Sequence, residues 1–294
     1  MDGDSMHFKK VSTILNQQNG LNLYRGCEHG CIYCDSRSKC YGMDHDFEDI
    51  EVKENALELL EEELKRKRKK VILSTGSMTD PYIPLEQCLN MTRGMLELIY
   101  KYGHGVHIQT KSSSILRDLD LLKKINKQAK TRISITLTTA DEALCKILEP
   151  NVSTTKERFQ TLCELQEAGI DTYVWLSPIL PFINDSLDNL RGILTYCKEA
   201  KVRGIICFGF GLTLREGNRE YFYQMLDAHF PKIKREYIKK FGNSYECNSP
   251  YHKYLMDYFI NFCKENQILY KIDEIFKELH TLYEDEAYEQ LSLF

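Results

Sequence analysis

Six short apolar runs alternate with longer amphipathic stretches along this chain, and this alternation constrains the fold more than any other feature. The runs are rich in β-branched and aromatic residues and lie at 21–24, 71–75, 105–110, 132–138, 172–179 and 204–210. Stretches of helical period lie between them, at 52–69, 85–102, 114–128, 155–168 and 186–201. A repeated strand and helix build a parallel sheet. The pattern therefore predicts an α/β protein with a partial (β/α)6 TIM-like barrel.

The pattern changes near residue 212, where the β-rich runs stop. Residues 218–264 have a helical pattern crowded with Tyr, Phe and Lys, and 269–289 have the pattern of a final acidic helix. The chain of 294 residues is long enough for a barrel, which typically takes about 250 residues, and for an appendage. We therefore expect an N-terminal segment, a partial barrel, a helical C-terminal extension and a short tail, at 1–20, 21–212, 213–289 and 290–294.

The composition limits where such a protein works. Hydrophobic residues make up 43% of the chain, and no run of 18 apolar residues is present. The formal net charge of −4 gives no overall attraction to nucleic acid, so such binding would need a local patch. The 11 cysteines are an odd number, which favours reduced thiols and a metal site over a disulfide framework. We expect a cytoplasmic protein without a membrane span.

Three cysteines in the segment RGCEHGCIYC follow the first expected strand, where barrel enzymes place their chemistry. Cys27, Cys31 and Cys34 have the spacing Cys-x3-Cys-x2-Cys. Zinc would need a fourth ligand, which His29 or Cys40 could supply. Three thiolates suit a [4Fe–4S] cluster instead, because each binds one iron and the fourth iron stays open to a substrate. The residues favour the cluster and leave zinc as an alternative.

With Tyr33 just before its last cysteine, this motif resembles the hallmark of the radical S-adenosylmethionine (SAM) superfamily. The resemblance implies that Cys27, Cys31 and Cys34 hold a [4Fe–4S] cluster whose open iron chelates SAM. It further implies reductive cleavage of SAM to a 5′-deoxyadenosyl radical, which abstracts hydrogen from an unreactive carbon. An electron donor such as flavodoxin or ferredoxin would be a partner.

Polar residues at the ends of later strands match what SAM binding needs. The SAM ammonium needs oxygen acceptors, which Ser77 and Thr79 could supply after the second strand. The SAM carboxylate needs a cation, and Lys111 ends the third strand. Ser134 and Thr136 lie on one face of the fourth strand, because side chains alternate with a period of two, and could reach the ribose. We expect these residues, with Tyr33, to bind SAM.

Within the superfamily the chain is most similar to the spore photoproduct lyase-like family, over roughly residues 20–210. YRGCEHGCIYC, the segment from Thr79 to Glu86, the TK that ends the third strand and the Arg-x-Ser of the fourth strand recur there as a series. The resemblance implies that Thr79, Lys111 and Ser134 contact SAM. It also implies a lyase-like reaction on nucleic acid, such as DNA lesion repair.

Two departures from that family bear on the reaction. The lyase has a cysteine where this chain has Ser77, and that cysteine returns a hydrogen atom to the substrate radical. A serine O–H bond is too strong for this role. Asp35 replaces a tyrosine that follows the last cluster cysteine. Reversal of the spore-type lesion is therefore not implied, and Cys207 and Cys247 are the candidate hydrogen donors.

The last five residues, QLSLF, resemble the peptide with which bacterial repair proteins bind the sliding clamp. In that peptide a glutamine forms hydrogen bonds and the apolar residues fill a pocket. We expect clamp binding through this tail, whose residues are Gln290, Leu291, Ser292, Leu293 and Phe294. The alternative is that these apolar residues pack on the barrel. Clamp binding would place the enzyme at DNA.

A basic and aromatic segment at 232–254 could provide a local surface for nucleic acid. Cations can follow phosphates, and aromatic rings can stack on bases. A surface helix with inward-facing aromatics has the same composition, so the segment does not decide the substrate. A radical SAM enzyme that modifies a protein or a small metabolite is the close alternative. A non-catalytic metal-binding interaction module is the second alternative.

Overall fold

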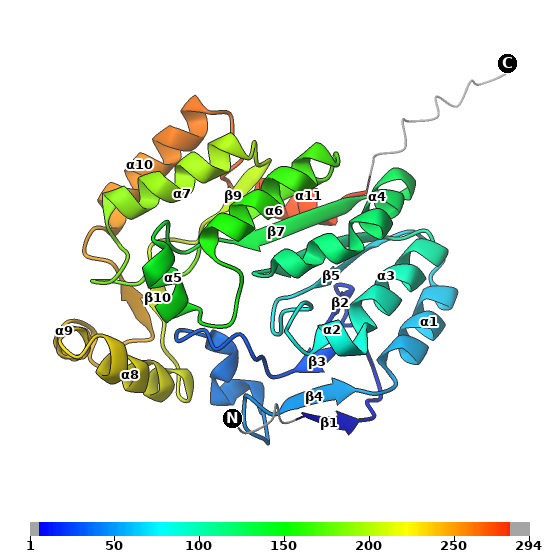
Figure 1. Ribbon diagram of the computed structural model, residues 1–294, viewed down its shortest axis with the longest axis horizontal. Coiled ribbons are helices and arrows are strands. Elements are labelled where there is room, and N and C mark those ends of the chain that lie inside the picture. The colour runs from blue at the N-terminus through cyan, green and yellow to red at the C-terminus, as the bar shows by residue number, and fades with distance from the viewer. Residues whose placement is uncertain (1–5, 283–294) are drawn as a thin grey trace, which may run out of the picture.

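The computed structural model describes residues 6–282 of the chain, and its centre is a curved sheet of six parallel strands (Figure 1). The strands follow the order β2-β5-β6-β7-β8-β9, with parallel pairing at every step. Their bounds are Gly20–Leu21, Ile72–Thr75, Gly105–Thr110, Thr131–Thr136, Asp171–Trp175 and Gly204–Ile206. Within the described chain β2 and β9 are the two edges of this sheet and do not pair with each other. The predicted partial barrel is confirmed.

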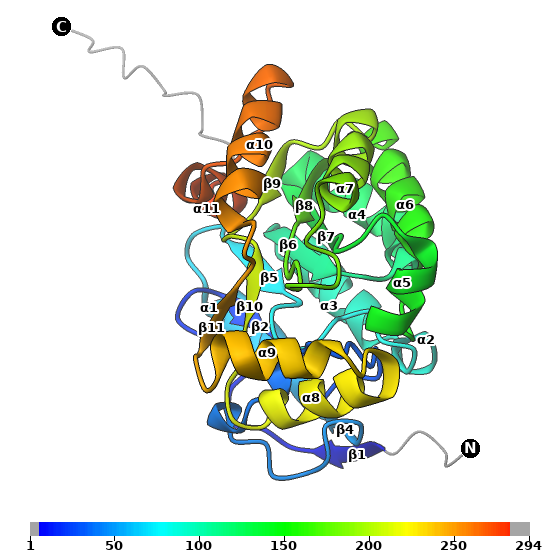
Figure 2. The same ribbon diagram turned by 90° about the vertical axis from the view of Figure 1, so that its left-hand side faces the viewer.

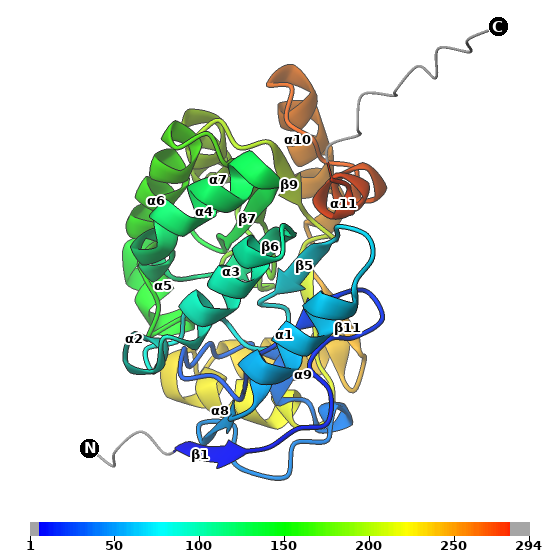
Figure 3. The ribbon, with the colours of Figure 1, turned by 90° about the vertical axis from the view of Figure 1, so that its right-hand side faces the viewer.

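Helices cover the outer face of the curved sheet (Figures 1 and 3). Each has an apolar stripe that packs against the strands, as with Leu60 and Leu64 of α1 or Leu162 and Leu165 of α6. The α6 helix begins with a capping box formed by Thr154 and Glu157. These helices are α1, α3, α4, α6 and α7, at Ala56–Arg66, Met91–Lys101, Leu119–Gln128, Thr155–Glu167 and Leu187–Glu199.

The strand and helix boundaries expected from the sequence differ most from those of the structure in the first two strand–helix units. The strand expected at 21–24 is split, because β3 (Tyr24–Arg25) pairs with β4 (Ile50–Lys53) in a separate sheet that also contains β1 (Met6–Lys9). Residues 52 and 53, expected to begin a helix, therefore end a strand. The helix expected at 85–102 is interrupted at Asn90, whose φ of 54° separates α2 (Glu86–Leu89) from α3.

Three short elements complete the connections between the strands and helices of the barrel. A 3₁₀ helix at Ser113–Asp118 precedes α4. The α5 helix, at Glu142–Leu148, follows β7 and is capped at its N-terminus by Asp141, whose carboxylate accepts hydrogen bonds from two backbone amides. Two further 3₁₀ turns, Asp35–Arg37 and Lys39–Tyr41, follow the cysteine motif. These turns keep the polypeptide that follows Cys34 compact.

The C-terminal extension has a helical core, as expected, but it also contains strands. Its helices are α8, α9, α10 and α11, at Asn218–His229, Ile233–Phe241, His252–Glu265 and Ile272–His280. The expectation that strands stop near residue 212 is wrong, because β10 (Gly211–Thr213) pairs with β11 (Glu246–Asn248). The domain boundaries drawn from the sequence stay predictions.

The extension covers the open side of the barrel. Ile205 of β9 donates a backbone hydrogen bond to Leu269 (2.8 Å), which protects an otherwise exposed strand edge. Figures 1 and 2 place α10 and α11 at this end of the molecule, and α8 and α9 with β1 and β4 at the other. Among residues 6–282, no helix combines the length and the apolar composition that a membrane crossing requires.

The turn after β5 requires a glycine. Gly76 has a φ of +97°, and a Cβ at this position would lie 1.9 Å from the carbonyl oxygen of Gln109 on β6. No rotation of a side chain can relieve a collision between a Cβ and a neighbouring backbone. The segment that begins here reaches the candidate site, so the glycine positions functional residues as well as the sheet.

The Gly76→Ala variant should therefore be destabilised by at least about 2 kcal/mol, because backbone strain and a steric collision add. Gly169→Ala is the matched control: Gly169 also has a positive φ (+75°), but nothing lies within 4 Å of the added Cβ. It should lose only about 1 kcal/mol. Urea unfolding of both variants measures the difference, and equal losses would contradict the steric argument.

Candidate active site

A cavity of about 610 Å³ lies at the carboxyl ends of the barrel strands. Residues that end or follow five successive strands line it: Gly76 after β5, Lys111 after β6, Thr136 of β7, Trp175 of β8 and Phe208 after β9. The cysteine motif closes one side, and Glu246, Asn248 and His252 of the C-terminal extension contribute to another. Parallel strands point their carboxyl ends to the same side, so residues far apart in sequence meet here.

Backbone hydrogen bonds fasten the cysteine loop to its surroundings. Cys27 donates to the carbonyl oxygen of Phe47 (3.2 Å), and Ile32 donates to that of Leu148 (3.0 Å). Asn151 donates its backbone N–H to His29 (3.2 Å) and its side-chain amide to Glu28 (2.8 Å). The loop is therefore held from both the loop before β4 and the end of α5, which positions its thiols before any metal binds.

Cys27, Cys31 and Cys34 all line the cavity, but their thiols are not gathered as closely as three ligands of one zinc ion would be. A tetrahedral zinc would bring its ligand atoms to about 3.8 Å from one another. Within residues 6–282, no trio of His, Cys, Asp or Glu that includes these cysteines has its ligand atoms all within 4.8 Å. Cys40, a proposed fourth ligand for zinc, is exposed and does not line the cavity.

Burial changes the chemistry of the thiols. It raises the pKa of Cys27 to about 12 and that of Cys31 well above its usual range. A buried thiol stays protonated unless a positive partner compensates the thiolate charge. Iron ions supply that charge, so three thiols that face one cavity fit a [4Fe–4S] cluster.

A buried network of charged side chains joins the cysteine loop to the end of β7. The Tyr33 hydroxyl donates to the carboxylate of Glu149, which also pairs with Arg158. Arg158 donates in turn to the backbone carbonyl of Thr136 (2.8 Å) at the end of β7. Burial opposes the charge on Glu149, but Arg158 and Lys111 outweigh it and lower the pKa of Glu149. The carboxylate stays charged and joins the loop to the barrel.

The carboxylate of Asp80 also joins the cysteine loop to the barrel, through the residues at the end of β6. Its carboxylate accepts hydrogen bonds from the Thr110 hydroxyl (2.7 Å) and the Lys111 backbone (2.7 Å), and His29 Nδ1 lies 3.5 Å away. Burial lowers the pKa of Lys111, but Cys31, Glu149 and Asp80 outweigh this and raise it. Lys111 is therefore a cation that faces the cavity.

The predicted SAM contacts divide into two groups. Tyr33, Ser77, Lys111 and Thr136 line the cavity. Thr79 and Ser134 are buried outside its lining, and the Ser134 hydroxyl is hydrogen-bonded to His107 Nε2 (2.8 Å). The structure brings the first group together at the cavity. Ser134 lies two residues before Thr136 on β7, farther from the carboxyl end of the strand. All six assignments stay predictions.

Neither predicted hydrogen donor lines the cavity. Cys207 is buried in the main core, and burial raises its pKa to about 12. Cys247 is buried in a second apolar cluster, and its thiol lies 3.8 Å from the Ser244 carbonyl oxygen. The assignment of a donor role to either cysteine stays a prediction, and Ser77 lines the cavity.

Several residues of this site were not identified from the sequence. Glu149 and Arg158 lie on or beside helices, where nothing local distinguishes them from surface charges. Trp175 ends β8 and Phe208 follows β9, and their position at the carboxyl ends of strands was the one available signal. His252 comes from the extension, so only the folded chain brings it to the cavity.

The comparison with family models decides the identity. The model of the radical SAM superfamily matches residues 21–191, which is more than half of the chain. The chain belongs to the radical SAM superfamily. This superfamily uses a [4Fe–4S] cluster and SAM, and the residues on the cysteine loop and at the strand ends fit both groups.

Relatives of this radical SAM protein include uncharacterised proteins of Mycobacterium tuberculosis and Methanocaldococcus jannaschii. The mycobacterial protein is 29% identical over 223 residues, which are 74% of this chain and 65% of that protein. The archaeal protein is 34% identical over 169 residues, which are 56% of this chain and 61% of that protein. The chain thus spans less than two thirds of the length of these relatives.

The fold is also that of spore photoproduct lyase. A structure of that enzyme complexed with dinucleoside spore photoproduct has a TM-score of 0.61 and 13% sequence identity, covering 90% of this chain and 81% of the lyase. Another structure of the lyase, with a TM-score of 0.55 and 15% identity, has bound AdoMet; the match covers 84% of this chain and 74% of the lyase. At this identity the likeness establishes the radical SAM fold and leaves the reaction open.

The histidine beneath the cavity generates a pH prediction. Burial, with the charges of His280 and Arg132, lowers the pKa of His107 from 6.5 to about 3. Above pH 6.5 the ring is neutral in both the folded and the unfolded chain. Below it the unfolded chain binds a proton that the folded chain does not, so stability falls as the pH falls toward 3.

His107→Gln should therefore flatten the pH dependence of the free energy of unfolding by about 1 kcal/mol per pH unit between pH 6.5 and pH 5. Anaerobic urea unfolding at the two pH values measures the slope. His229→Gln, which removes an exposed histidine, should leave the slope as in the wild type. An unchanged slope in His107→Gln would show that this ring does not govern the acid response.

Proposed function

We propose that this chain is a radical SAM enzyme whose substrate is a base of damaged or modified nucleic acid. The observation that carries the proposal is that three cluster-type thiols, a cation and strand-end hydroxyls line one cavity of about 610 Å³. The bound cofactors supply reductive cleavage of SAM and a carbon radical that abstracts hydrogen. The chain itself binds and orients both cofactors and the substrate.

Each polar residue of the cavity suits a different part of SAM. Lys111 is half-buried near Cys31, Glu149 and Asp80 and presents a point charge for the SAM carboxylate. The Ser77 and Thr136 hydroxyls face the same space and supply hydrogen-bond partners for the remaining polar groups of SAM. Tyr33 cannot turn away, because Glu149 accepts its hydroxyl hydrogen. The cavity is therefore organised before SAM enters.

Aromatic residues at the mouth of the cavity support a base as the substrate. The rings of Trp175 and Phe208 lie 5.6 Å apart, and Phe208 is 60% exposed. Tyr251 and Tyr254 are exposed beside His252, which lines the cavity. Exposed rings offer stacking surfaces to a base that has left its helix. The likeness to a lyase that binds a dinucleoside photoproduct supports the same class of substrate.

The basic and aromatic segment at 232–254 supports nucleic-acid binding only in part. Tyr237 is buried, and Phe241 packs against the same apolar cluster. Arg235, Lys239 and Lys240 of α9 are exposed, as cations that follow a phosphate backbone must be. We therefore assign the cations, and not these two rings, to the substrate surface.

The partners predicted from the sequence belong to this proposal as well. The clamp-binding tail, Gln290 to Phe294, lies outside the described residues. Sliding-clamp binding would bring the enzyme to DNA, and a flavodoxin or ferredoxin would supply electrons. A cytoplasmic location agrees with the need for reduced thiols and stays a proposal.

Catalysis is tested by anaerobic reconstitution followed by reductant and SAM. The wild type should form 5′-deoxyadenosine, and Cys27→Ala, Cys31→Ala and Cys34→Ala should lose both the cluster colour and the product, because each removes one iron ligand. Cys40→Ala removes an exposed cysteine outside the cavity and should retain both. A fully loaded wild type that forms no 5′-deoxyadenosine would favour the non-catalytic interaction module.

The substrate class is tested by comparing UV-irradiated DNA with unirradiated DNA in the same assay. The irradiated DNA should raise 5′-deoxyadenosine formation several-fold and lose photoproduct, both measured by mass spectrometry. Phe208→Ala should reduce this stimulation while leaving the basal SAM cleavage unchanged. If neither DNA changes the rate while a peptide or metabolite fraction does, the nucleic-acid assignment is wrong and the alternative substrate class holds.

A further inference from the structure

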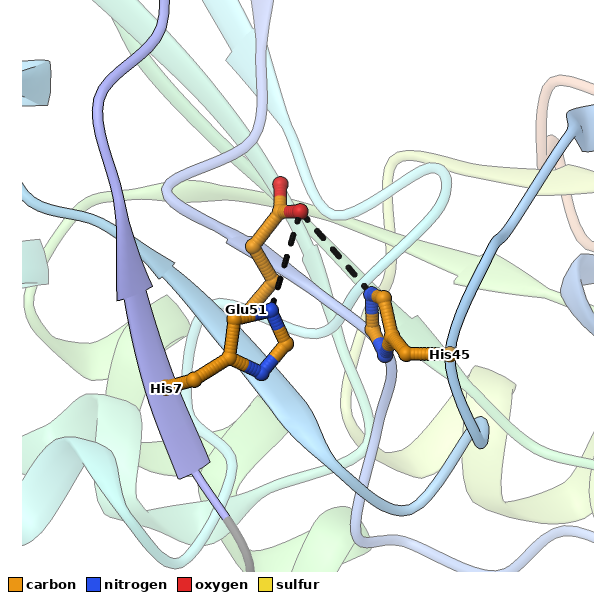
Figure 4. A group of neighbouring side chains, drawn as sticks. All are labelled: His7, His45 and Glu51. Atoms are coloured by element: carbon orange, nitrogen blue, oxygen red, sulfur yellow. Dashed lines mark ion pairs between the residues drawn. The ribbon is translucent and has the colours of Figure 1, made fainter.

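A second cluster of metal-binding side chains lies outside the candidate active site. His7 of β1, His45 of the loop before β4 and Glu51 of β4 point toward one another (Figure 4). Their ligand atoms all lie within 4.8 Å of one another, and within residues 6–282 this is the one such group of His, Cys, Asp and Glu. It does not include the cluster cysteines.

Both histidines are oriented as metal ligands are. The Nδ1 atom of His45 lies 3.0 Å from the carbonyl oxygen of Asp46, and that of His7 lies 3.0 Å from Asp49 Oδ2. These acceptors hold the proton on Nδ1, which leaves the lone pair of each Nε2 free. Each Nε2 lies 3.9 Å from the same atom, Glu51 Oε2. The two lone pairs and the carboxylate therefore converge.

Burial indicates that the cluster needs a ligand. The side chain of Glu51 is 3% exposed, and the Nε2 atom of His45 is buried without a hydrogen-bond partner. Such atoms are rare because each forfeits its bond to water. Lys9 Nζ lies 2.9 Å from Glu51 Oε2 and is the cation that balances the carboxylate. The Lys9 side chain is 46% exposed, so it can move aside for another cation.

We propose that His7, His45 and Glu51 bind a divalent transition-metal ion of the Zn²⁺ type, independently of the proposed function. Two imidazoles and a carboxylate are a common donor set for such ions, with ligand distances of about 2.0–2.2 Å. Each Nε2 atom lies 3.9 Å from Glu51 Oε2. Movements of roughly half an ångström would shorten these separations to the distance between two ligand atoms of one such ion. Three protein ligands leave the remaining coordination to water.

The site joins parts of the chain that support the cysteine loop. It links β1 to β4 and to the loop between residues 42 and 49. Phe47 of this loop accepts the backbone hydrogen bond of Cys27 (3.2 Å), and its ring lies 4.2 Å from the Arg37 guanidinium. A metal ion here would therefore stabilise the segment that positions the first cluster cysteine.

The test uses the full chain with its iron–sulfur cluster loaded anaerobically, incubated with Zn²⁺, desalted and analysed by mass spectrometry for both metals. The wild type should retain about one zinc ion per chain, and its iron content should not change. His7→Gln and His45→Gln should lose at least about tenfold in zinc affinity and keep their iron. His229→Gln, the matched control at an exposed histidine, should bind zinc as the wild type does. No bound zinc, or zinc retained by both ligand variants, would overturn the proposal.

Lys9→Ala separates a metal site from a network of ion pairs. At a metal site, removal of the competing ammonium group should tighten zinc binding by about tenfold. Zinc should then raise the Tm of Lys9→Ala and of the wild type, but not that of His45→Gln. A network of ion pairs alone predicts that Lys9→Ala is less stable and that zinc does not restore it. That result would also overturn the proposal.

Discussion

The buried carboxylate of Glu149 joins the cysteine loop to the barrel, and the geometry of the candidate site depends on it. It accepts the Tyr33 hydroxyl from the loop and pairs with Arg158 of α6, which holds the end of β7 through Thr136. A buried charge is costly unless every partner is in place. The loop, the helix and the strand must therefore assemble together, and the cavity acquires one well-defined shape.

The C-terminal extension completes this arrangement through apolar packing. Ile32 and Tyr33 of the cysteine loop share a hydrophobic cluster with Phe222 of α8 and Tyr237 of α9. The same extension protects the β9 edge and contributes His252 to the cavity. The radical SAM core thus has one wall that the barrel alone does not supply.

By the family resemblance found in the sequence, Ser77 stands where the lyase has its hydrogen-donating cysteine. Ser77 lines the cavity, and in the described part of the chain the cysteines in the lining are Cys27, Cys31 and Cys34. Cluster ligands cannot also serve as hydrogen donors. A hydrogen donor for the proposed substrate radical would therefore have to be a group other than these three thiols.

The sequence by itself determined the parallel barrel, the cysteine spacing and the strand-end residues Ser77, Lys111 and Thr136, because strand alternation and ligand spacing are local properties. It misplaced the first strand, since the pairing of Tyr24–Arg25 with β4 is a long-range choice. Only the tertiary structure decided the contacts of Glu149 with Tyr33 and of His7 with Glu51. These contacts join residues far apart in the chain, and no local pattern records which distant charges the fold will bury together.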